Sequence, residues 1–429
     1  MSNKCRILRY YLQYRYRKFG TKEILKNYHD KKLKKKISYI TKHSDFYREY
    51  QGKEQNEFPV IDKKIMLENF NRINTVGIDK EEALEFAIDS ERTREFSGKL
   101  KNITVGLSSG TSDSRGIFLV EDVEQDKWAA YVLAKFLTKG ILSRCKIAFF
   151  MRANSNLYES VGSKRIRFQF FDIYADVEEN FKKLQDFQAD VIVAQPSMLL
   201  MIANAMKNKK LDISPEKVIS VAEVLEKEDE LYLKGVFGLD VIHQAYQCTE
   251  GCLATTCKCG TLHLNEDIVY IEKEYLDEKR FVPIITDLER TAQPMIRYRL
   301  NDVLVEKKET CPCGSVFTAL EKIEGREDDV FQFETERGEI VSIFPDFIRR
   351  CILFAGDITD YRVLQMPDSS ITVFADISQD MKEKVYEEFR KLSEDKKFIL
   401  PKIDFKEYYY DKKRKLKRVE RCTTQKTNG

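Results

Sequence analysis

Residues 103–119 read ITVGLSSGTSDSRGIFL: an apolar, β-branched segment, a run of small hydroxylated residues with glycine, and a second apolar segment. Glycine lets the backbone turn and approach a ligand closely. Hydroxyl groups and successive loop N–H groups can bind an anion. No Gly-Lys-Ser/Thr follows, so this is not a Walker A loop. We interpret the stretch as a phosphate-binding loop, with a plain turn as the alternative. The expected phosphate ligands are Ser108, Ser109, Gly110, Thr111 and Ser112.

The chain beyond this loop alternates short apolar runs with amphipathic stretches. Runs of four to eight apolar residues are typical of buried strands, and Pro196-Ser197 is typical of a helix start. We expect strands at 145–151, 190–194, 218–221 and 240–246, and helices at 196–206 and 226–236. This alternation predicts an α/β domain with a mixed or largely parallel sheet.

The length of 429 residues indicates more than one domain. The first 45 residues look helical, because apolar residues recur at helical spacing among many lysines. After residue 325 the pattern changes to strands at 361–364 and 370–374 and a helix at 381–392. We therefore expect a large α/β domain over 1–324 and a small α+β domain over 325–429.

Charge and hydropathy exclude several classes of protein. The 73 Lys and Arg nearly balance the 70 Asp and Glu, which does not favour nucleic acid as a partner. Basic runs at both ends are typical of a solvated helix face or tail. No run approaches the ~20 apolar residues of a membrane span, and no apolar signal segment begins the chain. We expect a cytoplasmic protein that is a monomer or a homodimer.

Four short motifs follow one another in a familiar order. They are SSGTS (108–112), YQCTE (246–250), YRLND (298–302) and GREDD (325–329). Together they resemble the [ST]-S-G-T-[ST]-G, Y-G-x-T-E, Y-R-x-G-D and G-R-x-D-D motifs of the adenylate-forming superfamily. The phrases HLNED (263–267), QPMIRYRLND (293–302) and CPCG (311–314) are similar to the phenylacetate–CoA ligase-like branch, which includes CapK-like and deazaflavin-coenzyme adenylating proteins.

The resemblance assigns roles to the YQCTE motif. Glu250 would hold Mg²⁺, for which a carboxylate oxygen is a suitable hard ligand. Thr249 would donate to the α-phosphate of ATP, and Tyr246 would lie against the adenine ring. Such a site acts mainly by positioning and charge stabilisation.

The two later motifs complete the expected nucleotide site. Asp302 would accept hydrogen bonds from both ribose hydroxyls, and Arg326 would add positive charge near ribose or phosphate. Asp328 matches the hinge about which the small domain rotates between half-reactions.

The family also carries a catalytic lysine near its C-terminus. The segment KLKRV (415–419) has a similar form without the preceding glycine, and it makes Lys415 the candidate. Lys413 and Lys417 are competitors, and a solvated basic tail is an alternative interpretation.

The phosphate loop departs from the family pattern in two ways. Asp113 stands where the family has glycine, and the usual loop lysine is missing. Arg115 lies nearby and could supply charge instead. Asp113 also keeps open a non-catalytic, nucleotide-binding relative.

Cysteines crowd into two C-x-C-G pairs, 257–260 and 311–314. Glycine after each pair permits a tight turn that aims two sulfurs at one point, and four thiolates form a closed structural Zn²⁺ site. The expected ligands are Cys257, Cys259, Cys311 and Cys313, with Cys252 or His263 as a replacement for one of them. Free structural thiols are the alternative.

The leading functional hypothesis is an AMP-forming ligase that uses ATP and Mg²⁺. It would activate a small-molecule carboxylate as acyl-AMP and pass it to a thiol, either coenzyme A or an acyl carrier protein. The alternatives are transfer of AMP to a hydroxyl or phenol, and the non-catalytic relative. The substrate pocket is expected near Arg152, Asn154, Asn156 and Tyr158, unless that segment is a surface loop.

Overall fold

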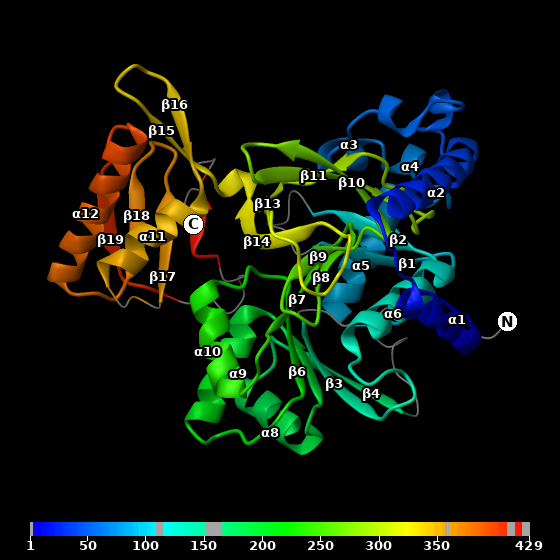
Figure 1. The fold of residues 1–429 in the computed structure, drawn as a ribbon, viewed down its shortest axis with the longest axis horizontal. Coiled ribbons are helices and arrows are strands. Elements are labelled where there is room, and N and C mark those ends of the chain that lie inside the picture. The colour runs from blue at the N-terminus through cyan, green and yellow to red at the C-terminus, as the bar shows by residue number, and fades with distance from the viewer. Residues whose placement is uncertain are drawn as a thin grey trace. The chain divides into compact units, whose positions relative to one another are not determined.

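The computed structural model describes residues 3–93, 95–108, 115–151, 165–356, 358, 360–409 and 417–422. The chain divides into two units (Figure 1). Unit 1 comprises Met1–Leu300 and Glu306–Glu321, and unit 2 comprises Asn301–Val305 and Lys322–Gly429. The domain boundary expected near residue 325 stays a prediction.

A parallel sheet lies at the centre of unit 1. Its strands pair in the order β4-β3-β5-β6-β7, every neighbouring pair being parallel. The bounds are β3 (Cys145–Met151), β4 (Ile166–Asp172), β5 (Val191–Ala194), β6 (Lys217–Val221) and β7 (His243–Cys248). Helices cover both faces of this sheet, and buried side chains line both faces. A strand that is buried on both faces is apolar along its whole length, which explains the short apolar runs in the sequence.

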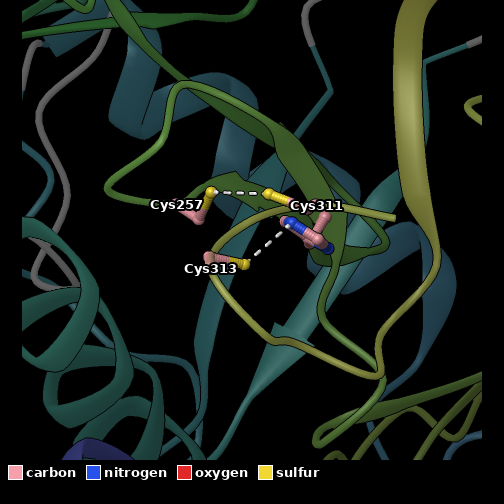
Figure 2. Close-up of side chains that lie close together, drawn as sticks. Cys257, Cys311 and Cys313 are labelled. Carbon is pink, nitrogen blue, oxygen red and sulfur yellow. Dashed lines mark hydrogen bonds between the residues drawn. The ribbon is translucent and has the colours of Figure 1, made fainter. Parts of the chain in front are cut away.

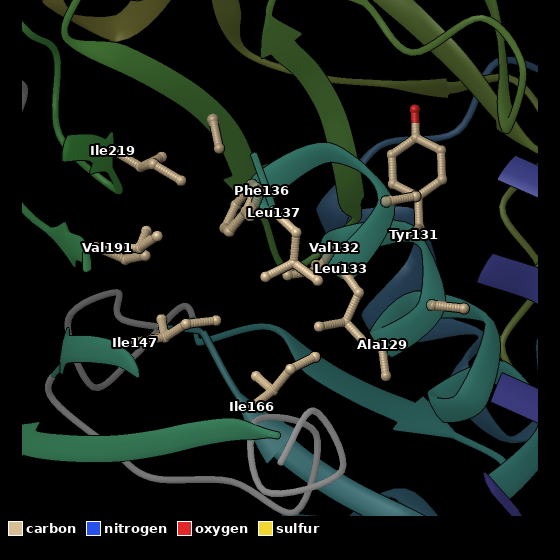
Figure 3. Close-up of a cluster of buried hydrophobic side chains, with 14 of the residues drawn as sticks. Ala129, Tyr131, Val132, Leu133, Phe136, Leu137, Ile147, Ile166, Val191 and Ile219 are labelled. Carbon is tan, nitrogen blue, oxygen red and sulfur yellow. The ribbon is translucent and has the colours of Figure 1, made fainter. Parts of the chain in front are cut away.

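Helices cover the two faces. On one face, α1 (Asn3–Tyr16) and α6 (Asp122–Phe136) pack on β3 to β6 through side chains such as Leu133, Phe136, Ile147 and Ile219 (Figure 3). On the other face lie α8 (Val177–Phe187), α9 (Pro196–Lys207) and α10 (Lys227–Phe237) (Figure 1). Strands and helices expected from the sequence are thus confirmed, although β7 begins at His243 because residues 239–242 connect it to α10.

The sheet becomes antiparallel after β7. The next strands are β8 (Gly251–Thr256) and β9 (Leu262–Leu264), which pair in sequence order, and β14 (Ala319–Arg326) pairs with β9. A further antiparallel group consists of β10 (Val269–Tyr275), β11 (Arg280–Asp287) and β12 (Tyr298–Arg299). The sheet as a whole is therefore mixed.

The N-terminal third is mainly helical and ends in a hairpin. After α1 come α2 (Lys22–His43), η1 (Arg48–Tyr50), η2 (Gln55–Glu57), α3 (Lys63–Glu68), α4 (Phe70–Ile73) and α5 (Lys80–Thr93). The hairpin consists of β1 (Thr104–Leu107) and β2 (Ile117–Val120), which are antiparallel. The loop between these two strands is the expected phosphate loop.

Unit 2 has its own sheet and core. Its central strands β17 (Tyr361–Gln365) and β18 (Ile371–Ala375) are antiparallel, and β19 (Ile403–Lys406) and β20 (Val419–Arg421) add to the two edges in parallel. Buried side chains of α11 (Pro345–Ala355) and α12 (Gln379–Lys396) pack on them. The remaining elements are β13 (Asp302–Glu306), η4 (Glu327–Asp329), β15 (Phe331–Glu334) and β16 (Ile340–Ile343). The expected fold class, an α/β part with a smaller α+β part, is confirmed.

None of the described helices combines the length and the apolar character that crossing a membrane requires. All ten cysteines lie in the described part of the chain, and none of them forms a disulfide.

The core beneath α9 provides a test of this packing. Leu199 is fully buried, with 0% exposure. We expect Leu199→Ala to lower the free energy of unfolding by about 3 kcal/mol, through lost burial and the cavity left behind. The control is Leu231→Ala on α10, where the side chain is 60% exposed and the change should cost little. Urea denaturation followed by circular dichroism measures both, and equal midpoints would contradict the packing.

Candidate functional site

Thr249 and Glu250 form the turn between β7 and β8. Cys248 and Gly251 oppose each other in the ladder, so these two residues are the whole connection. The register shifts between Tyr246 and Gln247, and such a bulge changes the direction of the side chains that follow. Because β7 is a parallel strand, the turn lies at the carboxyl edge of the sheet, where α/β proteins bind ligands. Tyr246 itself is buried.

Tyr298 orients the Glu250 carboxylate. The Tyr298 hydroxyl donates to Glu250 Oε1 at 3.1 Å. Burial of Tyr298 raises the pKa of its hydroxyl, and the charge of Glu250 raises it further, so the hydroxyl keeps its proton. Among the described residues no basic side chain forms an ion pair with Glu250, which is half-buried. The carboxylate is therefore held by a neutral donor.

Arg290 joins this turn to the hairpin that carries the phosphate loop. Its Nη1 donates to the carbonyl oxygens of Thr249 (2.9 Å) and Glu250 (3.3 Å). Its Nη2 donates to the carbonyl oxygen of Leu119 in β2 (3.4 Å) and to Gln293 Oε1 (3.2 Å). Gln293 in turn bonds β2 through both ends of its amide. The sequence analysis did not identify Arg290. The one feature that could have drawn attention to it is its position, three residues before the segment QPMIRYRLND.

The base of the expected phosphate loop is a closed hairpin end. The Ser108 amide donates to the Gly116 carbonyl at 2.7 Å, and the Gly116 amide donates to Ser108 Oγ at 2.7 Å. Arg115 donates to the Ser108 carbonyl and forms a two-point ion pair with Glu91 of α5. Its charge is thus balanced within the fold. Of the other loop residues, Ser109, Gly110, Thr111, Ser112 and Asp113 lie outside the described residues.

Unit 2 contains the last two residues of the YRLND motif, Asn301 and Asp302, and the whole of GREDD. Asn301 stands where the Y-R-x-G-D pattern has glycine, and it links two motifs: its Nδ2 donates to Asp328 Oδ2 at 3.0 Å and its carbonyl accepts from the Glu327 amide at 2.6 Å. Asp302 directly follows Asn301, at the start of β13, and Arg326 directly precedes Glu327, at the end of β14. The motifs YRLND and GREDD are therefore joined by hydrogen bonds.

Of the three lysines that are candidates at the C-terminus, the structure describes only Lys417. Lys413 and Lys415 lie outside the described residues, as do Arg152, Asn154, Asn156 and Tyr158. Lys417 pairs with Asp329 Oδ1 at 2.6 Å, and Asp329 is buried. Lys417 is thus engaged within unit 2 in this conformation.

A cluster of three cysteines and one histidine lies between β8, β9 and the segment before β14. The ligand atoms of Cys257, His263, Cys311 and Cys313 all lie within 4.8 Å of one another (Figure 2). Cys257 Sγ is 3.7 Å from Cys311 Sγ, and Cys313 Sγ is 3.4 Å from His263 Nε2. Two segments about fifty residues apart are thus brought to one point.

The cluster is held as metal ligands usually are. His263 Nδ1 is 3.1 Å from the Phe317 carbonyl, which can only accept, so Nδ1 carries the proton and Nε2 turns its lone pair to the thiols. The Ser315 amide donates to Cys313 Sγ. Gly260 and Gly314 have φ of +80° and +76° and close the two turns, because L side chains rarely adopt this conformation.

Cys259 differs from the other cysteines of the two pairs. It is exposed and lies outside the group of four, although its amide donates to Cys257 Sγ at 3.4 Å. Cys252 is buried and accepts from Asn265 Nδ2. The structure therefore brings His263, the alternative ligand, to the position expected for Cys259.

Comparison with known proteins identifies the fold. No family model matches the chain. Over 95% of its length it superposes on 91% of a 2-hydroxyisobutyryl-CoA ligase in complex with 2-HIB-AMP, with a TM-score of 0.69 and 15% identity. A GH3.15 acyl acid amido synthetase matches 90% of the chain over 86% of its own length, with a TM-score of 0.57 and 13% identity.

The chain has the adenylate-forming ligase fold.

A sequence match supports this result. The indoleacetate–lysine synthetase of Pseudomonas savastanoi is 27% identical over 234 residues, which are 51% of this chain. The match spans 56% of the length of that enzyme. The resemblance to the adenylate-forming superfamily is confirmed, whereas the phenylacetate–CoA ligase-like branch stays a prediction.

Arg290 should be essential to this part of the adenylate-forming fold. Arg290→Met removes the donor for three half-buried backbone carbonyl contacts, so we expect the free energy of unfolding to fall by about 2 kcal/mol. Arg165→Met is the control, because the Arg165 bond to the Leu142 carbonyl is exposed. Urea denaturation compares the two, and an unchanged midpoint for Arg290→Met would contradict the role.

Proposed function

We propose that this protein activates a carboxylate with ATP as an acyl-adenylate and then transfers the acyl group to a nucleophile. One observation carries the proposal: the Glu250 carboxylate lies at the carboxyl edge of the sheet, oriented by Tyr298 and fixed by Arg290. In addition, nearly the full length of the chain has the same fold as a ligase that binds an acyl-AMP.

The first step needs positioning and charge stabilisation rather than a strong base. A carboxylate oxygen of the acid attacks the α-phosphorus of ATP, the bond to the bridging oxygen breaks, and the electron pair leaves with pyrophosphate. Glu250 is our candidate ligand for Mg²⁺: its carboxylate accepts from one neutral hydroxyl and is unpaired with any described cation, which suits a hard divalent ion. Bound Mg²⁺ would neutralise phosphate charge.

The other roles follow the motifs. We assign the phosphates to the loop 108–112 and to Thr249, and the adenine to Tyr246. Ribose recognition is assigned to Asp302 and Arg326, hinge motion to Asp328, and the charge near the α-phosphate to Lys415.

The nucleophile of the second step is a thiol or an amine. The sequence favoured a thiol of coenzyme A or of a carrier protein. An amine is favoured by the sequence match to an indoleacetate–lysine synthetase, whose identity exceeds that to the CoA ligase of known structure. In either case the sulfur or nitrogen attacks the acyl carbon, AMP leaves, and the nucleophile loses a proton.

Pyrophosphate release with pools of small carboxylic acids tests the proposal. We expect release that depends on the acid, followed by faster turnover when the correct nucleophile is added. Parallel reactions with coenzyme A and with free lysine separate the thioester from the amide. A stable AMP adduct of a hydroxyl compound, or no release with any acid, would contradict the proposal.

Matched tyrosine–glutamate pairs locate the reaction. Tyr298→Phe should lower the rate of pyrophosphate release about tenfold, because a hydrogen bond to a charged group is lost, and Glu250→Gln should lower it further. The control pair is Tyr275 and Glu306, whose hydroxyl–carboxylate distance is 2.5 Å. Tyr275→Phe and Glu306→Gln should leave the rate nearly unchanged; equal losses in both pairs would remove Glu250 from the site.

We further propose that Cys257, His263, Cys311 and Cys313 hold a structural Zn²⁺. Three thiols and an imidazole whose lone pair faces them are a donor set that suits this ion. With four protein ligands the ion would have no open position, so it would supply a cross-link rather than a reactive centre. It would tie the chain after β8 to the chain before β14.

Elemental analysis tests this site. We expect about one zinc per chain, with His263→Ala and Cys311→Ser losing most of the metal. Cys259→Ser is the matched control and should keep it, because Cys259 lies outside the group of four. Removal of zinc by a chelator should also lower the unfolding temperature. Loss of metal from Cys259→Ser with retention in His263→Ala would reverse the assignment.

A further inference from the structure

Lys36 of α2 is a buried cation without a hydrogen-bond partner. The residue is 5% exposed, and among the described residues no group accepts a hydrogen bond from its Nζ. Burial of an ammonium group without a partner costs free energy. Natural proteins keep such costly groups mainly at functional sites. The surroundings of Lys36 therefore indicate what it does.

The helix α2 places Lys36 beside a group of carboxylates. Lys32 lies one helical turn earlier on the same face of α2, and its Nζ pairs with Glu289 Oε1 at 3.0 Å. Burial lowers the pKa of the Lys36 ammonium, whereas the nearby charges of Asp287, Glu124 and Glu289 raise it. Lys36 thus faces acidic residues from α6 and from the end of β11.

Two of these acids hold the segment 287–292 by its amides. Asp287 Oδ1 accepts from the amides of Glu289 (2.7 Å) and Arg290 (2.8 Å). Glu124 Oε1 accepts from the amides of the next two residues. Both acids are buried, and in the described part of the chain neither forms an ion pair. An ionised carboxylate accepts such bonds better than a protonated one, so the segment depends on their charge.

The segment 287–292 in turn supports the turn at Glu250. The Arg290 guanidinium donates to the carbonyls of Thr249 and Glu250. Asp287 Oδ2 is 3.6 Å from the position that a Cβ on Gly251 would occupy, so Asp287 also lies beside the residue that follows Glu250. A shift of this segment would therefore move the Glu250 turn.

The other cations around the segment already have partners. Lys32 and Lys127 pair with the two carboxylate oxygens of Glu289, at 3.0 and 2.8 Å. Arg290 donates to backbone carbonyls and to a glutamine side chain. Lys36 is thus the cation whose charge remains for the two acids that hold the amides.

We propose that Lys36 is a positioning residue: its ammonium group stabilises the carboxylates of Asp287 and Glu124, which fix the segment 287–292. Through Arg290 this segment fixes Glu250. The inference rests on the proposed function, which gives Glu250 its role, and deepens it by adding a residue of α2. Lys36 itself touches neither the nucleotide nor the acid in this assignment.

The charge of Lys36 depends on pH near neutrality. Burial lowers the pKa of its ammonium to about 8 from the ordinary 10.5, because it outweighs the attraction of the carboxylates. Between these values the unfolded chain holds a proton that the folded chain has lost, so the contribution of Lys36 to stability rises as pH rises through 8. Lys36→Met should therefore unfold at no lower urea concentration than the natural chain at pH 7.

Hydrogen exchange of backbone amides tests the proposal in the full chain. In Lys36→Met the amides of residues 289–292 should exchange about tenfold faster, because their acceptors lose the nearby cation. Exchange in β5 should stay unchanged. The natural chain should show the same local increase between pH 7 and pH 9, after correction for the intrinsic effect of pH, whereas Lys36→Met should not.

The pH profile of pyrophosphate release is the second readout. Lys36→Met should lower the rate about tenfold at pH 7. The natural rate should fall above pH 8 as the ammonium loses its proton, and this fall should be absent from the variant. Lys36→Arg keeps its charge at all these pH values and should keep its rate at pH 9.

The matched control is the neighbouring lysine of α2. Lys35 is exposed, so Lys35→Met should change neither the exchange at residues 289–292 nor the rate. Lys36→Gln serves as a second neutral variant, and urea denaturation checks that each variant is folded.

Three outcomes would overturn the proposal. The first is unchanged exchange at residues 289–292 in both Lys36→Met and Lys36→Gln. The second is faster exchange throughout the chain, which would show a general loss of stability. The third is a local increase in exchange with an unchanged rate and pH profile. A local increase in a chain that releases no pyrophosphate with any acid would count against the proposed function alone and would support the action of Lys36 on the segment.

Discussion

The candidate site depends on the half-buried guanidinium group of Arg290. Turns such as Thr249–Glu250 have backbone carbonyls without partners in a ladder, and a buried carbonyl without a partner is costly. One planar side chain satisfies two carbonyls of this turn and one of β2. Because β2 belongs to the hairpin of the expected phosphate loop, the same contacts fix the distance between this hairpin and Glu250. Loss of this donor would therefore affect the geometry of both halves of the proposed nucleotide site.

A second junction supports the opposite side of the sheet. The HLNED segment contributes the cluster ligand His263, and Asn265 binds the Cys252 carbonyl and Thr255 in β8. Its acidic residues connect more distant parts: Tyr131 of α6 donates to Asp267 Oδ1 at 2.8 Å, and the Thr318 amide donates to Glu266 Oε2 at 2.5 Å. A phrase that resembles the family is thus mainly structural, and it joins the thiol cluster to the helices that cover the parallel sheet.

Sequence patterns predicted the elements better than the contacts between them. The parallel strands were predictable because they are buried on both faces and read as apolar runs, as in CKIAFFM. The YQCTE motif could be recognised in the sequence because its five residues are consecutive in the chain. The C-x-C-G pattern favoured Cys259, since local spacing reveals thiols but not a histidine that strand β9 brings from outside the turn. Arg290 carried no local motif, because it acts through chain crossings that only the fold creates.

The basic side chains around the hairpin serve to hold the fold together. Arg115 binds Glu91, and Arg290 binds backbone carbonyls. Both arginines therefore hold the hairpin in place. The segment 61–63 belongs to the same region, since Ile61 forms a bridge with Tyr298 while the stem of Lys63 lies beside Gly116. Hydrogen bonds thus connect the hairpin through Arg290 to the turn at Glu250, and Tyr298 connects that turn to the start of α3.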